Sequence, residues 1–95
     1  MALLITPEAN DDVAELYSFG TLMFGFAAAT DYTLGLEAAF HLLGEFPRSG
    51  RERQEVRPPV RVWLYRSHIV AYRVENEDVV ILRVLHHSMD WMDEL

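Results

Sequence analysis

The hydrophobic pattern changes its period once along the chain, near Pro47, and this change constrains the fold more than any other feature. Before Pro47, apolar residues recur at three- and four-residue spacing, as on one face of an α-helix. From about residue 60 onward, the apolar runs are short and rich in Val and Ile, which is typical of strands. One such change within 95 residues predicts a single α+β domain spanning residues 1–95.

The first half of the sequence predicts two consecutive helices. Thr6 can cap the first helix, Pro7 suits the first helical position, and Gly25 ends the pattern. A second helix is expected over residues 26–46, stopped by Pro47, so the two helices form a hairpin. Its expected buried stripe contains Tyr32, Leu36, Ala39, Phe40 and Leu43. Further apolar residues remain, which suggests a surface for a partner: Phe19 and residues 26–29.

The rest of the chain predicts strands. Strands are expected at residues 3–5, 60–64, 68–74 and 79–85, a loop at 48–59, and a short acidic tail at 88–95. The order is β-α-α-β-β-β. We therefore expect a helical hairpin packed on a small antiparallel sheet.

The register of the strands decides which side chains share a face. Three-residue turns at 65–67 and 76–78 would pair residue 74 with 80 and residue 71 with 83. The helix-facing side would then hold Val62, Leu64, Val70, Tyr72, Val74, Val80, Leu82 and Val84. A two-residue turn before residue 68 would push Arg61 toward the core, where an unpaired charge is costly. We therefore predict that the opposite face carries Arg61, Trp63, Arg73 and Arg83.

Charge is distributed unevenly along the chain. The net charge is −7, yet all eight basic residues are Arg, and they fall between Arg48 and Arg83. Arg binds carboxylates and phosphates through a planar fork, so the segment is either a site for an anionic partner or a set of solvated strand charges. The negative net charge argues against non-specific nucleic-acid binding, and we expect no sequence-specific DNA contact.

Several classes of protein are not expected. The chain has no Cys, so disulfides and thiolate metal sites are impossible. Neighbouring strand residues point to opposite faces, so His86 and His87 make poor joint metal ligands, and His87 and Ser88 a poor nucleophile pair. The start of the chain lacks the pattern of a signal peptide, and no apolar run reaches the ~20 residues that span a bilayer. We expect a cytoplasmic protein without metal, cofactor or membrane contact.

Three segments together resemble the C-terminal half of ParE toxins, a branch of the RelE/ParE superfamily. They are Arg57-Pro58-Pro59-Val60-Arg61, the run from Ser67 to Val74 (SHIVAYRV) and the run from Ile81 to Asp90 (ILRVLHHSMD). The N-terminal half is similar as well, at residues 6–9 (TPEA), 36–40 (LEAAF) and 45–50 (EFPRSG). The resemblance covers nearly the whole chain.

This resemblance implies the toxin of a bacterial type II toxin–antitoxin pair. It implies a RelE/ParE-like fold, a cognate ParD-like antitoxin that binds the toxin directly in a hetero-oligomer, and DNA gyrase as the target. The residues expected to meet the antitoxin or the target are Arg57, Arg61, Trp63, Arg73, Arg83, His86 and Met89. The hairpin would offer an apolar groove to an antitoxin helix.

Two alternatives remain open at this stage. One is a ribosome-dependent messenger endoribonuclease of the RelE type, which would use Arg61, Arg73, Arg83 and His86. The absence of Lys, and of any Tyr after Tyr72, disfavours this activity. The other is an inactive relative that retains antitoxin binding. The acidic net charge and the apolar start of the second helix, Phe26-Ala27-Ala28-Ala29, depart from the usual ParE pattern and leave the target uncertain.

Overall fold

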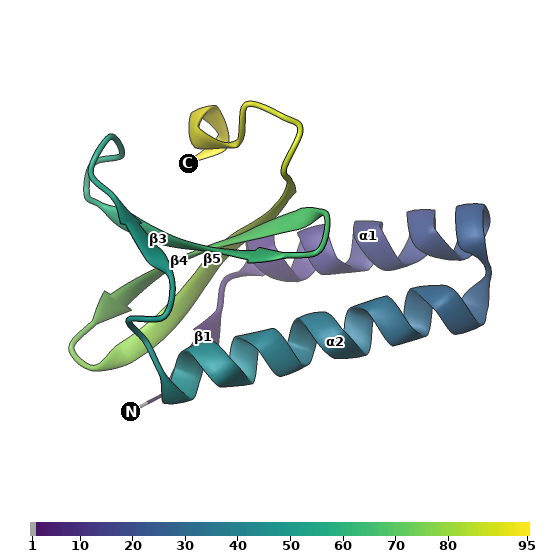
Figure 1. Ribbon diagram of the computed structural model, residues 1–95, viewed down its shortest axis with the longest axis horizontal. Coiled ribbons are helices and arrows are strands. Elements are labelled where there is room, and N and C mark those ends of the chain that lie inside the picture. The colour runs from purple at the N-terminus through teal and green to yellow at the C-terminus, as the bar shows by residue number, and fades with distance from the viewer. Residues whose placement is uncertain (1) are drawn as a thin grey trace.

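The computed structural model describes residues 2–95 and places two antiparallel helices on one face of a sheet (Figure 1). The elements are β1 (Leu3–Ile5), α1 (Pro7–Phe24), α2 (Phe26–Glu45), β2 (Arg51–Arg53), β3 (Val60–Tyr65), β4 (His68–Glu75), β5 (Asp78–His86) and the short 3₁₀ helix η1 (Trp91–Glu94). The α+β class and the helical hairpin are confirmed. The hairpin is longer than the sheet, so its closed end extends beyond the strands (Figure 1).

The start of α1 is tied to the sheet by its cap. The Thr6 hydroxyl accepts a hydrogen bond from the Ala9 amide at 3.1 Å and donates to the Leu82 carbonyl at 2.8 Å. One side chain thus satisfies a free helix amide and joins α1 to β5. At the other end of α1, a single residue links the helices. Gly25 has a φ of +93°, a conformation open to glycine and strained for other residues.

The sheet has five strands in the order β1-β5-β4-β3-β2. The pairs among β2, β3, β4 and β5 are antiparallel as expected, whereas β1 pairs with β5 in parallel, so the sheet is mixed. The long crossover through both helices permits the parallel pairing. The segment 48–59 was also not entirely loop, because β2 forms an edge strand on β3. Within the short acidic tail, η1 lies over the sheet on the side away from the helices (Figure 1).

The hairpin of β4 and β5 differs from the predicted register. Asn76 and Glu77 form a two-residue turn with positive φ values of 49° and 72°. Val74 consequently pairs with Val79 rather than with Val80. A β-bulge then restores the predicted pairing of Ala71 with Arg83. Ile81 therefore lies in the core, although it was predicted on the other face. Of the residues predicted to face the helices, Val80 pairs with Arg73 on the other face and Leu82 falls at the bulge. Val74 is exposed.

The register between β3 and β4 overturns the predicted Arg face. A two-residue turn leaves Tyr65 paired with His68, so Arg61 pairs with Tyr72 and Trp63 with Val70. Arg61 and Trp63 therefore lie on the helix-facing side, and Val62 and Leu64 lie on the other side. Val62, Ala71 and Arg83 form a second cross-strand row on the other side of the sheet. Arg83 therefore lies on the opposite face from Arg61 and Trp63.

The rejected register is stable because the charge of Arg61 is satisfied at the rim of the sheet. Its Nη1 donates to the Gly50 carbonyl at 2.8 Å, and its Nη2 lies 3.6 Å from a Glu52 carboxylate oxygen. Arg61 is therefore not an unpaired buried charge, because Gly50 and Glu52 from the preceding segment supply its partners.

The core lies between the hairpin and the helix-facing side of the sheet. Its buried members are Ala9, Leu36, Phe40, Leu43, Val70, Tyr72, Val79, Ile81 and Val84. The Tyr72 hydroxyl donates to the Pro47 carbonyl at 2.7 Å and accepts from the Gly50 amide at 2.8 Å. Burial raises the pKa of this phenol, which keeps it a donor. Gly50 has no room for a side chain, because a Cβ there would collide with the Tyr72 ring.

Candidate functional site

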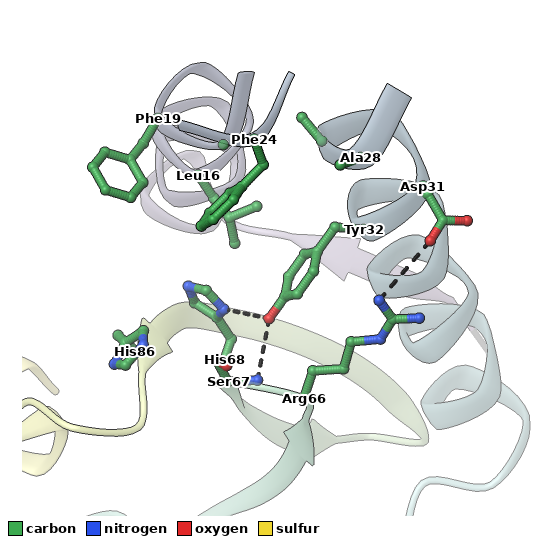
Figure 2. Close-up of a pocket in the computed structure, with 12 residues that line it drawn as sticks. Leu16, Phe19, Phe24, Ala28, Asp31, Tyr32, Arg66, Ser67, His68 and His86 are labelled. Atoms are coloured by element: carbon green, nitrogen blue, oxygen red, sulfur yellow. Dashed lines mark hydrogen bonds and ion pairs between the residues drawn. The ribbon is translucent and has the colours of Figure 1, made fainter. Parts of the chain in front are cut away.

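A groove lies between the closed end of the helical hairpin and the turn that joins β3 to β4 (Figure 2). It encloses about 500 Å³, and apolar side chains from both helices form its walls: Leu16, Phe19, Phe24 and Ala28. The groove exists because the hairpin overhangs the sheet, which leaves its inner face without a strand to cover it. Phe19 and Phe24 are mostly exposed as a result.

Polar side chains form the floor of this groove. The Tyr32 hydroxyl lies 2.7 Å from Nδ1 of His68 and accepts a hydrogen bond from the Ser67 amide at 3.2 Å (Figure 2). His86 packs edge-on against His68, with ring centroids 5.3 Å apart. These residues meet because Tyr65, His68 and His86 form one cross-strand row on the helix-facing side.

One Arg stands at the rim of the groove. The Arg66 guanidinium lies 5.5 Å from the ring centroids of both Tyr32 and Tyr65, a cation–π distance. Its Nη1 is 3.9 Å from a carboxylate oxygen of Asp31, so this exposed ion pair is weak. The groove therefore offers apolar walls, hydrogen-bonding groups at its base and a positive charge at its edge.

The surroundings shift the pKa values of two floor residues. Burial, and then the nearby His86 and His87, lower the pKa of His68. Burial raises the pKa of Tyr32. Both shifts favour the uncharged forms of Tyr32 and His68 near pH 7. A neutral floor suits an apolar occupant that can also accept or donate one hydrogen bond.

The lowered pKa of His68 predicts a pH-dependent stability. An unfolded His takes up a proton near pH 6.5, whereas the folded His68 does so only at lower pH. The contribution of His68 to the free energy of unfolding is complete above the unfolded pKa. It is lost as the pH falls below that value and through the lower folded pKa, because the unfolded state then binds more protons. Urea unfolding across this range should show a smaller pH dependence for His68→Gln than for the parent chain. Equal slopes for the two proteins would contradict the prediction, and His41→Gln, an exposed His on α2, is the control.

The structure scatters most of the residues predicted from the sequence. Among those seven residues, His86 alone lines the groove. Arg57 is exposed in the loop before β3, Met89 is exposed after β5, and Trp63 packs against the core. The groove residues that sequence reasoning missed are Tyr32, Arg66 and His68. Tyr32 was assigned only to a buried stripe, although a phenol in such a stripe requires a hydrogen-bond partner.

Arg83 is held in a structural contact. Its Nε and Nη2 donate to the two carboxylate oxygens of Asp12 at 2.7 and 2.9 Å. Asp12 also accepts from the Val84 amide at 2.9 Å, so it covers the edge of β5 that β1 leaves open. This bidentate pair raises the pKa of Arg83. Arg83 thus joins α1 to the sheet.

The residues named for ribonuclease chemistry do not form one site, although Arg61 and Arg73 line a common pocket. Arg61 and His86 lie on the helix-facing side at opposite ends of the sheet, while Arg83 belongs to the row on the other side. Nδ1 of His86 lies 2.7 Å from the Ser88 hydroxyl and also accepts from the Ser88 amide. Both contacts join residues two apart in the sequence and are exposed, so they stabilise the turn after β5.

Residues 2–95 contain neither a metal-binding cluster nor a membrane-spanning helix. Within that range, no group of three or more His, Asp or Glu side chains could hold a metal ion. Across the same residues, no helix has the length and hydropathy needed to cross a membrane.

Comparison with known proteins identifies the family. Residues 3–91 match the family model described as the ParE toxin of the type II toxin–antitoxin system parDE. Toxin ParE1 of Caulobacter vibrioides is 31% identical over 86 residues, which cover 90% of this chain and 88% of that protein. Toxin ParE1 of Mycobacterium tuberculosis is 33% identical over 88 residues, covering 92% and 90%. Toxin ParE3 of Caulobacter vibrioides is 43% identical over 60 residues, but the match spans only 63% of this chain and 60% of that protein.

The fold is shared with a solved structure. A chain of the chromosomal ParDE toxin–antitoxin system from P. aeruginosa superposes with a TM-score of 0.79 at 24% identity, over 90% of this chain and 95% of that one. The family match extends over nearly the whole sequence. The chain therefore belongs to the ParE toxins of type II toxin–antitoxin systems.

Proposed function

We propose that this ParE toxin inhibits DNA gyrase and is silenced by a ParD-type antitoxin whose helix occupies the groove. The observation that carries the antitoxin interaction is the exposed apolar surface at the closed end of the hairpin. Large apolar side chains lie on it in the open: Phe19, Leu22, Met23, Phe24 and Phe26. A patch of this kind on a small domain is typical of a protein–protein interface.

The chemistry of the groove indicates what should fill it. Apolar walls on two antiparallel helices fit the apolar face of a third helix, with anchors at i, i+3 and i+4 spacing. Arg66 at the rim favours an acidic residue on that helix, and the neutral floor favours one hydrogen-bonding side chain. The solved ParDE system with the same fold supports an antitoxin partner of this class.

Gyrase as the target is supported by the ParE family membership and by the separation of Arg61, Arg83 and His86 in the fold. A gyrase inhibitor needs no catalytic group of its own. The protein would act in the cytoplasm, where gyrase works on the chromosome.

A supercoiling assay with purified gyrase tests the target. We expect the purified protein to inhibit supercoiling and to leave gyrase stalled on cleaved DNA, and we expect the antitoxin encoded beside it to relieve both effects. Translation in a cell-free extract should continue in the presence of the toxin. Full gyrase activity at a large excess of toxin, with messenger cleavage in the extract, would replace this proposal by the ribonuclease.

A further inference from the structure

A second pocket lies at the end of the sheet away from the groove, where β3 begins and β4 ends. It has a volume of about 620 Å³ and brings together three Arg from separate segments: Arg48 after α2, Arg61 on β3 and Arg73 on β4. Pro58 and Pro59 line it as well. Three guanidinium groups in one pocket form a candidate binding site for an anion.

The contacts already present leave Arg73 poorly satisfied, whereas Arg61 donates to the Gly50 carbonyl at 2.8 Å. Two carboxylates share the pocket, yet Glu52 lies 3.6 Å from Arg61 and Glu75 lies 3.9 Å from Arg73. Charge-assisted hydrogen bonds of this type are usually about 2.7–2.9 Å long. Nε of Arg73 is buried and has no hydrogen-bond partner within residues 2–95.

The charge of the pocket indicates the kind of anion. Three Arg and two Glu give a local charge of 3 − 2 = +1, in a chain whose net charge is −7. A single negative charge is therefore matched, whereas a dianionic phosphate would also face both Glu carboxylates. A polyanionic nucleic acid is further repelled by the rest of the molecule. A carboxylate has the planar geometry that an Arg fork binds through two parallel hydrogen bonds.

We propose that this pocket binds a carboxylate from an acidic segment of a protein partner. The incoming carboxylate would accept hydrogen bonds from the guanidinium groups of Arg48 and Arg73, while Arg61 stays bonded to the Gly50 carbonyl. The site lies apart from the apolar groove, so one partner chain could occupy both or two partners could bind separately. The inference does not depend on gyrase being the target.

Nuclear magnetic resonance titration with a tetraglutamate peptide tests the site on the free toxin. We expect saturable shifts of the Arg73 Nε–H resonance and of the backbone amides around Arg48 and Arg73. Binding should weaken about tenfold in Arg48→Gln and in Arg73→Gln, the loss of roughly one charge-assisted hydrogen bond. Glu75→Gln should bind more tightly, because it removes a competing carboxylate. Arg51→Gln, an exposed Arg on β2 outside the pocket, should bind as the parent does.

Three results would overturn the proposal. One is the absence of a saturable shift at Arg73 Nε. Another is equal weakening by Arg48→Gln and Arg51→Gln, which would indicate a diffuse charge effect. The third is tighter binding of inorganic phosphate or of a single-stranded oligonucleotide than of tetraglutamate, which would assign the pocket to phosphate groups. Arg48 is on an exposed segment, so its variant keeps the test valid should Arg73→Gln unfold. No antitoxin or gyrase is present, so failure here is distinguishable from failure of the proposed function.

Discussion

Replacing Phe19 and Phe24 together by Asp is expected to weaken binding of the antitoxin by at least about 100-fold. Both rings line the groove and are mostly exposed in the free toxin, so a partner helix would bury them on binding. Burial of one Phe side chain contributes roughly 1.5–3 kcal/mol, and each 1.4 kcal/mol corresponds to about tenfold in affinity. Isothermal titration calorimetry with the purified antitoxin measures the change.

Leu34→Asp is the matched control for this variant. Leu34 lies on α2 with 60% of its surface exposed, against 62% for Phe19, but it does not line the groove. The control should bind the antitoxin with unchanged affinity. Because the substituted positions are exposed, the double variant should also keep the unfolding midpoint of the parent. An affinity equal to that of the parent would remove the groove from the antitoxin interface.

Asp12→Ala is expected to lower the free energy of unfolding by about 3 kcal/mol. The Asp12 side chain is only 11% exposed, and its loss leaves the Arg83 fork and the Val84 amide without their acceptor. Removing one partner of a largely buried ion pair typically costs about 3–5 kcal/mol, and the partial exposure of Arg83 places the value at the lower end. Urea unfolding followed by circular dichroism measures it.

Two further variants separate the ion pair with Arg83 from the hydrogen bond with the Val84 amide in the loss of stability. Asp12→Asn can still accept from the Val84 amide but loses the charge, so it should cost less than Asp12→Ala. Asp11→Ala changes the exposed neighbouring residue on α1 and should alter stability by less than about 0.5 kcal/mol. Equal unfolding curves for Asp12→Ala and Asp11→Ala would show that the contact with Arg83 does not stabilise the fold.

Local signals predicted the helices and the family accurately. Thr6, Pro7, Gly25 and Pro47 mark the ends of both helices, because capping and backbone restriction act within a few residues of the chain. The stripe of α2 was correct at Leu36, Phe40 and Leu43 for the same reason. The family resemblance was confirmed over residues 3–91, since it rests on the order of several motifs.

The sequence by itself determined the α+β class, the helical hairpin and the apolar excess at its closed end, because these depend on composition and on spacing along the chain. Only the tertiary structure decided the register of β3, β4 and β5, and with it which side chains line the groove. Two positive-φ turns and one bulge turned Ile81 inward and moved Arg61 and Trp63 to the helix-facing side. A shift of one residue exchanges the faces of a strand, and the stabilising partners of Arg61 and Arg83 come from distant segments. That is why the groove floor, and the meeting of Arg48 with Arg61 and Arg73 in one pocket, were invisible in the sequence.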